Sequence, residues 1–242
     1  MPEENRTFVK YLKLPFQFDV VKLQTDLDLL VGDSWNNHYN DQAYEGNWKL
    51  ISLYSGTGKE NEIFAEQNAT TALIETAIMK KSRYFREVVN EFKCELLSVR
   101  LLKLSVGAII KPHKDFKLGY EDDNFRIHIP IITNDSVKFI LGGERLVMAP
   151  GECWYTNVNH THSVTNEGEV DRVHLVIDGQ RNEWSDKLFF SLAPKENLIK
   201  SNEKNEVETY KRMIEELGHM KTEATTKLIE EIQQKVKDLE KE

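Results

Sequence analysis

The chain has 242 residues, of which 40% are hydrophobic and 30% are charged, and its formal net charge is −8. This composition excludes disordered and collagen-like chains, and no apolar run approaches the roughly 18 residues that a membrane span requires. The acidic balance argues against binding of nucleic acid through phosphate neutralisation. The first ten residues show no cationic, apolar secretion signal. With only Cys94 and Cys153, no disulfide framework is expected, so we predict a cytoplasmic protein with reduced thiols and no membrane partner.

The first 92 residues mix strands and helices. Residues 8–14 alternate enough for a strand, which Pro15 is expected to end. Asp19 stands before an apolar stripe at helical spacing, as the N-cap of a helix would. Further elements are expected at residues 48–54 (strand), 70–79 (helix) and 84–92 (helix), with turn-rich segments at 34–47 and 55–68.

From residue 96 onward, short apolar segments recur with turns between them, among which Gly142-Gly143 and Pro150-Gly151 are the strongest. Strands are expected at residues 97–105, 108–111, 125–132, 137–141, 145–148, 152–156, 163–165 and 170–178. About eight short strands at this spacing indicate a sandwich or barrel. Together with the preceding helices they predict an α+β fold with a mainly β core, a double-stranded β-helix of the jelly-roll or cupin type. We assign residues 1–194 to this domain.

Residues 195–242 form a second, charged segment that we interpret as a helical C-terminal extension. Apolar residues recur three or four positions apart, which is typical of an amphipathic helix or of a helix pair broken at Gly218. Three interpretations remain open: a helix packed on the body of the protein, a helical arm that forms a homodimer, and a frayed tail.

The stretch IIKPHKD (109–115) carries candidate metal ligands. In an extended chain the residues i and i+2 point the same way, so His113 and Asp115 would face one point. The stretch VNHTHSVTN (158–166) offers His160 and His162 as a third ligand. Two imidazoles and one carboxylate on one face of an ion leave neighbouring positions open, which suits non-haem Fe(II).

Two predicted strands each carry Arg and His two residues apart on one face and apolar residues on the other. These polar pairs are Arg126 with His128 and Arg172 with His174. They could be solvated, as on a one-sided sheet. They could instead line the inside of the roll and bind an anion, because a guanidinium binds a carboxylate with two parallel hydrogen bonds.

In five stretches between residues 107 and 178 the sequence resembles the aspartyl/asparaginyl β-hydroxylase family of Fe(II)- and 2-oxoglutarate-dependent oxygenases, which includes bacterial proline cis-hydroxylases. The matching pieces are GAIIKPHKD (107–115), RIHIP (126–130), GECW (151–154), HSVTN (162–166) and RVHLVID (172–178). The resemblance implies that His113, Asp115 and His162 hold Fe(II) and that Arg172 binds the distal carboxylate of 2-oxoglutarate. It prefers His162 over His160, because His162 lies ten positions before Arg172. The vertebrate members lack the carboxylate ligand, so Asp115 makes this chain more similar to the bacterial enzymes that hydroxylate free amino acids.

The resemblance also implies roles for residues around the metal. Arg126 and His128 match positions that hold cosubstrate or substrate. In the aromatic loop before residue 48, His38 could anchor the loop, or His38 or Asn40 could reach the substrate pocket. Trp154 could belong to the core or form a pocket wall. We expect a small amino acid or a peptide as substrate, with a carboxylate held by Arg126 and His38.

Family chemistry then implies hydroxylation of an unactivated C–H bond with O2, while 2-oxoglutarate is converted to succinate and CO2. Two other classes of function stay open from the residues alone. One is a non-oxidative cupin-like metal protein, which would ignore 2-oxoglutarate. The other is a non-catalytic binding module that recruits a partner through residues 203–242.

Overall fold

The computed structural model describes residues 8–30, 35–62, 72–200, 203–218 and 223–239. The chain divides into two compact units, Met1–Leu198 and Ile199–Glu242. Within the described ranges, no helix is both long enough and apolar enough to span a bilayer.

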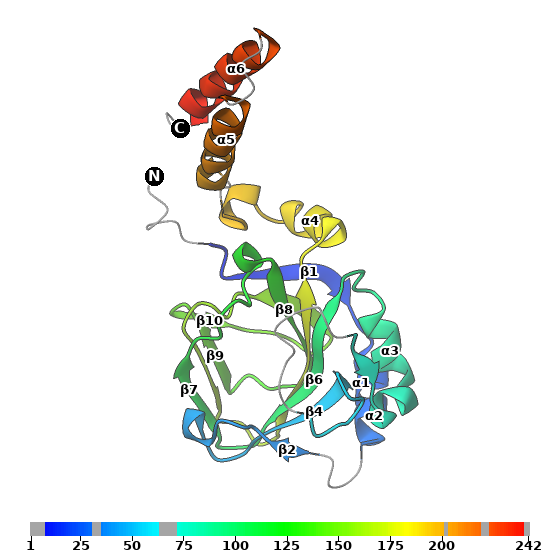
Figure 1. Cartoon of the computed structure of the whole chain (residues 1–242). Coiled ribbons are helices and arrows are strands. Elements are labelled where there is room, and N and C mark those ends of the chain that lie inside the picture. The colour runs from blue at the N-terminus through cyan, green and yellow to red at the C-terminus, as the bar shows by residue number, and fades with distance from the viewer. Residues whose placement is uncertain (1–7, 31–34, 63–71, 201–202, 219–222, 240–242) are drawn as a thin grey trace. The chain divides into compact units, whose positions relative to one another are not determined.

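The first unit is built on two antiparallel sheets that face each other (Figure 1). Its strands are β1 (Tyr11–Gln17), β2 (Asn36–Asn37), β3 (Tyr44–Glu45), β4 (Trp48–Ser55), β5 (Ile74–Glu75), β6 (Leu96–Leu104), β7 (Ile109–His113), β8 (Asn124–Ile132), β9 (Val137–Leu141), β10 (Glu144–Leu146), β11 (Glu152–Thr156), β12 (His162–Asn166) and β13 (Arg172–Gln180). The larger sheet has the order β1-β11-β8-β13-β6-β4-β2, with β5 beside β4, and the smaller has the order β10-β9-β12-β7-β3. Strands β6 to β13 thus form the predicted double-stranded β-helix, and the fold class is confirmed.

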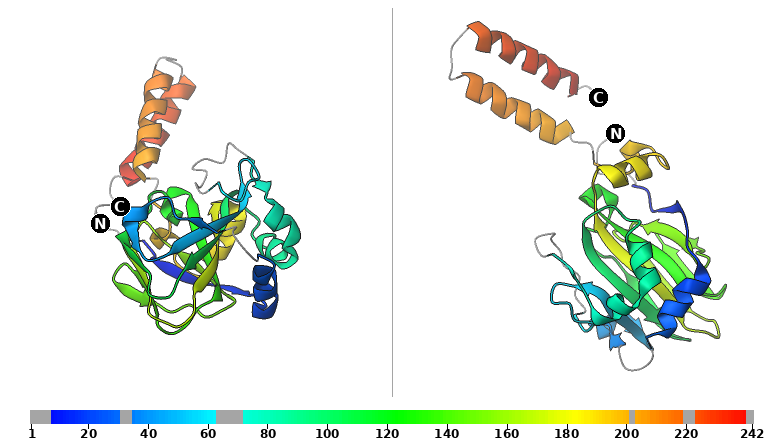
Figure 2. Two further views of the ribbon diagram at one scale, coloured as in Figure 1. Left: turned by 90° about the horizontal axis from the view of Figure 1, so that it is seen from below. Right: turned by 90° about the vertical axis from the view of Figure 1, so that its right-hand side faces the viewer.

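Helices cover the outer face of the larger sheet, where α1 (Val20–Asp28), α2 (Ala77–Lys81) and α3 (Arg83–Val89) lie together (Figures 1 and 2). Asp19 is the N-cap of α1, as predicted, and its Oδ1 accepts the N–H groups of Val21 at 3.0 Å and Lys22 at 3.1 Å. Helix α4 (Glu183–Phe190) was not predicted, although Asn182 and Ser185 form a capping box at its start.

Two predicted boundaries are wrong. Pro15 does not end the first strand, because β1 is an edge strand that pairs with β11 alone, so a missing N–H is tolerated there. The helix expected over residues 70–79 begins at Ala77, where the side chain of Thr76 accepts the N–H of Met79 as the N-cap. Residues 63–71 lie outside the described ranges.

Strands β8 and β13 are buried on both faces, although each is apolar on one face only. The apolar faces belong to the core. The faces that carry Arg126, His128, Arg172 and His174 point between the two sheets, and all four side chains are buried. The interpretation that these faces are exposed to solvent is therefore wrong. Where these four side chains lie, the space between the sheets is lined by polar and positively charged groups.

The second unit contains α5 (Glu203–Gly218) and α6 (Glu223–Leu239), which pack against each other. The pattern allowed one helix or a pair broken at Gly218, and the structure has two helices, the first of which ends at Gly218. Ile232 and Val236, one turn apart on α6, are buried, as the amphipathic pattern predicts. The homodimer through this extension stays a prediction.

Candidate metal centre

Three predicted ligands converge between the sheets. His113 ends β7 and lies directly opposite His162, the first residue of β12, while Asp115 follows β7 by two residues. One ligand atom from each side chain lies within 4.8 Å of the others. His113 Nε2 is 3.7 Å from Asp115 Oδ1, and the two imidazole rings are 4.2 Å apart at their centroids. The antiparallel pairing of β7 with β12 therefore brings together residues that are distant in sequence.

Backbone carbonyls orient both imidazoles. His113 Nδ1 is 2.8 Å from the carbonyl oxygen of Lys111, and His162 Nδ1 is 3.1 Å from that of His160. In each ring Nδ1 thus donates its proton to the backbone, which leaves the lone pair on Nε2, the tautomer that a metal ligand needs. Burial lowers the pKa of His162 to about 4, so its ring is neutral. Two imidazole nitrogens and a carboxylate oxygen fit a divalent iron ion with open coordination positions.

Asp115 is held from behind by a buried ion network. Arg126 Nη1 donates to Asp115 Oδ2 at 2.5 Å, and the same guanidinium donates to both oxygens of Asp178, at 2.7 and 3.0 Å. Asp178 is 0% exposed and also accepts from Arg100 Nη2 at 3.0 Å and Ser98 Oγ at 2.8 Å. Burial favours the neutral form of Asp115, but Arg126 and the two imidazoles outweigh it and lower the pKa of the carboxyl. The carboxylate of Asp115 therefore stays ionised, with Oδ1 free of Arg126 and available to a metal ion.

Arg100 and Asp178 were not predicted as site residues. Asp178 lies on the same face of β13 as Arg172 and His174, and Arg100 lies two residues after Ser98 on one face of β6, so alternation could have indicated both. The prediction for Arg126 concerned cosubstrate or substrate, whereas the structure directs its guanidinium to two carboxylates of the chain itself.

Arg172 lies on the inner face of β13 and is only 1% exposed. Its Nη2 is 2.8 Å from His174 Nδ1, and its Cζ lies 5.9 Å from the ring centroid of Phe139. Its Nε has no hydrogen-bond partner, and no carboxylate among the described residues pairs with it. Burial lowers the pKa of Arg172 to about 9. The side chain is thus a buried cation without an anion.

Neutral aromatic groups separate Arg172 from the triad. Phe139 stacks on His162 at 6.3 Å and contacts His128 at 5.6 Å, measured between ring centroids. His128 Nδ1 is 3.4 Å from His174 Nδ1. Burial, and next the charge of Arg172, lower the pKa of both imidazoles far below the usual range. The space between Arg172 and His162 is therefore lined by uncharged rings.

The predicted substrate residues occupy different environments. His38 stacks on Trp48 with ring centroids 3.6 Å apart, and Trp48 lies 6.3 Å from His113, so His38 stands near the triad. Asn40 is exposed, and its backbone N–H donates to His38 Nδ1 at 3.4 Å. Trp154 is half-buried opposite His128, and its indole N–H donates to Glu152 at 2.9 Å.

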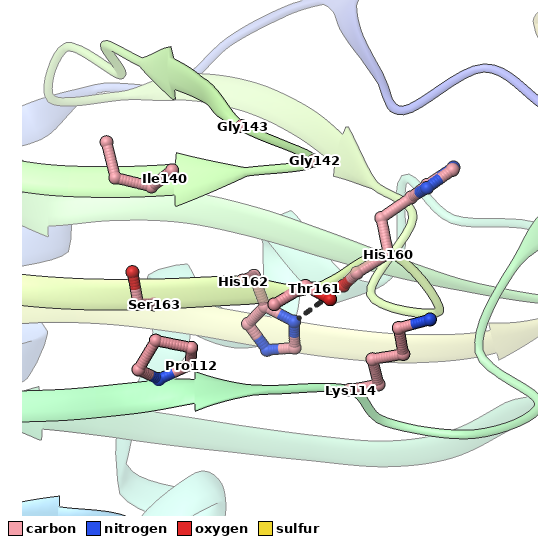
Figure 3. Close-up of a pocket in the computed structure, with 9 residues that line it drawn as sticks. All are labelled: Pro112, Lys114, Ile140, Gly142, Gly143, His160, Thr161, His162 and Ser163. Atoms are coloured by element: carbon pink, nitrogen blue, oxygen red, sulfur yellow. Dashed lines mark hydrogen bonds between the residues drawn. The ribbon is translucent and has the colours of Figure 1, made fainter.

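A cavity of about 380 Å³ adjoins the triad at the ends of β7, β9 and β12 (Figure 3). It is lined by Pro112, Lys114, Ile140, Gly142, Gly143, His160, Thr161, His162 and Ser163. His162 is the triad member that reaches it. The ring of His160, the competing ligand, points away from the ring of His162, and the metal-ligand cluster contains His162.

A polar clasp joins the two loops that carry Asp115 and His162. Asn159 Oδ1 accepts the N–H of Leu118 at 3.2 Å, and its Nδ2 donates to Glu121 at 2.8 Å and to Asp122 at 2.9 Å. The backbone N–H of Asp115 donates to Val158 O at 2.9 Å. These bonds set the spacing between the two ligand-bearing segments.

We expect Asn159→Ala to weaken metal binding about 10–100-fold, as is usual when an outer hydrogen bond that orients ligands is lost. Co(II) titration followed by its visible spectrum measures both the affinity and the ligand geometry. Asn134→Ala is the matched control, because Asn134 is also half-buried and bonds to Asn166 at the far end of β12. Equal Co(II) affinities in the two variants would show that the clasp does not position the ligands.

Comparisons with known proteins match the sequence to one family and to a curated relative. A sequence model of the aspartyl/asparaginyl beta-hydroxylase family matches residues 19–182. An L-proline cis-3-hydroxylase 2 from a Streptomyces species is 25% identical over 165 residues, which cover 67% of this chain and 57% of the relative. The chain thus matches less than two thirds of that relative's length.

Two solved structures that match the chain have low sequence identity and TM-scores below 0.5. One is an oxidoreductase of the 2OG-Fe(II) oxygenase family from Burkholderia pseudomallei (14% identity, 72% of this chain, 86% of that chain, TM-score 0.48). Another is HygX from Streptomyces hygroscopicus with nickel and 2-oxoglutarate bound (9% identity, 73% of this chain, 84% of that chain, TM-score 0.47).

Proposed function

The chain belongs to the aspartyl/asparaginyl β-hydroxylase family, and from this premise we propose that it is an Fe(II)- and 2-oxoglutarate-dependent dioxygenase. Its reaction hydroxylates an unactivated C–H bond of an amino acid or amino-acid residue and releases succinate and CO2. The proline hydroxylase relative supports a small-molecule substrate, and the ligand triad supports the metal.

The observation that carries the proposal is the unpaired, buried guanidinium of Arg172. A buried charge without a partner is costly, so a cation in this position calls for an anionic ligand. Phe139 touches both Arg172 and His162, which places the cation one aromatic ring away from a metal ligand. The triad would hold one end of a short dicarboxylic acid through the metal, and the planar fork of Arg172 would bind the carboxylate at its other end.

Each neighbouring side chain then has a defined task. His113, His162 and Asp115 would hold the metal, and Arg126 keeps the second oxygen of Asp115 away from it. When bound, Fe(II) with 2-oxoglutarate and O2 would supply the oxidising chemistry that no side chain provides. Phe139 forms part of a dry wall. Because His174 Nδ1 accepts from Arg172, the proton of this neutral ring is on Nε2, which would offer a hydrogen bond to the cosubstrate without adding charge.

Replacement of Arg172 by Gln tests this function. Losing one charge-assisted hydrogen bond costs about 1.5–3 kcal/mol, so we expect the Kd for 2-oxoglutarate to rise roughly 10- to 150-fold. Isothermal titration of the Ni(II)-loaded protein measures it without turnover. Arg145→Gln, which removes an exposed guanidinium bonded to backbone carbonyls, is the control. An unchanged Kd in Arg172→Gln would refute the assignment.

A substrate screen separates this function from the two other classes. The protein, with Fe(II) and ascorbate, should decarboxylate 2-oxoglutarate when the right amino acid or peptide is added. A non-oxidative metal protein would bind metal but ignore 2-oxoglutarate, and a binding module would bind neither.

Both cysteines are free, which supports the proposed cytoplasmic location.

A further inference from the structure

The charged groups around the triad do not balance. The described charges on the inner faces are the guanidiniums of Arg100, Arg126 and Arg172 and the carboxylates of Asp115 and Asp178. A divalent metal would add two positive charges, and 2-oxoglutarate would bring two negative ones. One positive charge is then left over in a buried space, where an uncompensated charge is costly.

Hydrogen bonding identifies Arg100 as the unbalanced cation. Each of the three nitrogens of Arg126 donates to a carboxylate, with a bidentate pair of bonds to Asp178 and a further bond to Asp115. Arg100 makes one bond to Asp178, at the oxygen that already accepts from Ser98 and Arg126, and its buried Nε has no partner among the described residues. Burial lowers the pKa of Arg100, and the charge of Asp178 opposes this without outweighing it. At Arg126 burial also lowers the pKa, but the carboxylates of Asp178 and Asp115 outweigh burial, so the pKa of Arg126 is raised.

Arg100 is linked to the metal ligand Asp115 through the carboxylate of Asp178 and the guanidinium of Arg126. It lies on β6 opposite Val176 of β13 and Ser52 of β4. The pKa of His38 is lowered to about 4 by burial and next by the charge of Arg100, while the charges of Asp115 and His113 also reach this ring. Because His38 Nδ1 accepts the N–H of Asn40, the ring proton is on Nε2, so His38 is a neutral donor beside a cation.

We propose that Arg100 binds a carboxylate of the substrate and that this protein therefore acts on carboxylic acids and rejects their neutral amides. The inference rests on the proposed function, since it concerns the substrate of that site. It replaces Arg126, whose guanidinium is already occupied, as the residue that holds the substrate's negative charge. The carboxylate can come from two sources, the α-carboxylate of a free amino acid or the side chain of an acidic residue.

Acetate is the minimal probe of this site. The protein is loaded with Ni(II) and 2-oxoglutarate, so that the metal and Arg172 are occupied, and its thermal midpoint is compared in sodium acetate and in sodium chloride at equal ionic strength. We expect acetate to raise the midpoint of the wild type and of Arg100→Lys but not of Arg100→Gln. Equal midpoints in the two salts for the wild type, or the same acetate effect in Arg100→Gln, would overturn the proposal.

Turnover distinguishes the two sources of the carboxylate. With Fe(II), the decarboxylation of 2-oxoglutarate is measured for free L-amino acids beginning with L-proline, for their carboxamides, and for end-blocked peptides with and without Asp. We expect kcat/KM to be about tenfold or more higher for acids than for the matching amides, and Arg100→Gln to remove this difference. Stimulation by Asp peptides alone would assign the side-chain source, and stimulation by free acids the α-carboxylate.

The controls separate this inference from the proposed function. Arg83→Gln removes an exposed guanidinium paired with Glu87 and should behave as the wild type. If the wild type failed to bind Ni(II) and 2-oxoglutarate at the outset, the proposed function itself would be wrong. If it bound both and turned over acid and amide equally, only the role of Arg100 would be lost.

Discussion

Replacing His113, Asp115 or His162 by Ala should abolish substrate-dependent succinate formation, and the first two changes should leave the fold intact. Each change removes one of three protein ligands, which the remaining two cannot replace. His113 and Asp115 lie at the end of β7 with partly exposed side chains, so their loss should not disturb the core. Metal content after dialysis, succinate yield and the circular dichroism spectrum measure the three parts of this prediction.

His160→Ala is the matched control for the triad. His160 lies two residues from His162, and its backbone carbonyl, which orients His162, survives the substitution. We expect His160→Ala to keep both metal and turnover. Loss of metal in His160→Ala together with its retention in His162→Ala would reverse the assignment of the third ligand.

Asp178→Asn should destabilise the first unit by about 3–5 kcal/mol, the usual cost of removing one partner from a buried ion pair. Asp178 is fully buried and holds both Arg126 and Arg100, so the amide would leave two guanidiniums short of negative charge. Urea unfolding followed by tryptophan fluorescence measures the change, because all four tryptophans (Trp35, Trp48, Trp154 and Trp184) precede residue 198.

The pH dependence supplies a second test of Asp178. Burial favours the neutral carboxyl, but Arg126 and Arg100 outweigh it and hold the pKa of Asp178 far below its ordinary value. The stabilisation is therefore present above the unfolded-state pKa of about 3.9 and is lost as the pH falls below it. The free energy of unfolding should fall less steeply below about pH 4 in Asp178→Asn than in the wild type.

An exposed ion pair provides the control for this experiment. Glu167→Gln breaks the pair with Lys138, in which both side chains are about half exposed, and should cost about 0–1 kcal/mol. If Asp178→Asn cost no more than Glu167→Gln, the buried network would not stabilise the fold as described.

The parts of this structure that depend on local pattern could be predicted from the sequence. Asp19 caps a helix because a side-chain oxygen and two backbone N–H groups lie within three residues of each other. His113 and Asp115 could be paired because they are two residues apart at the end of a strand. The alternation along β8 and β13 showed which residues share a face, although not whether that face is solvated.

The parts that depend on register and on partners distant in sequence could not be predicted. Arg126 is tied to Asp178 because β8 lies antiparallel beside β13 with these two residues opposite each other. Arg100 joins them because β6 flanks β13 on its other side. Pro15 was misjudged for a similar reason, since an edge strand tolerates a proline that a central strand would not.

The central claim is that two imidazoles and one carboxylate hold iron while Arg172 binds the far end of 2-oxoglutarate. An anaerobic crystal structure with Fe(II) and 2-oxoglutarate, with anomalous data at the iron edge, tests it most directly. We predict one iron peak bonded to His113 Nε2, His162 Nε2 and Asp115, and the distal carboxylate on the guanidinium of Arg172. Iron bound elsewhere, or a cosubstrate that leaves Arg172 without a carboxylate, would contradict the account.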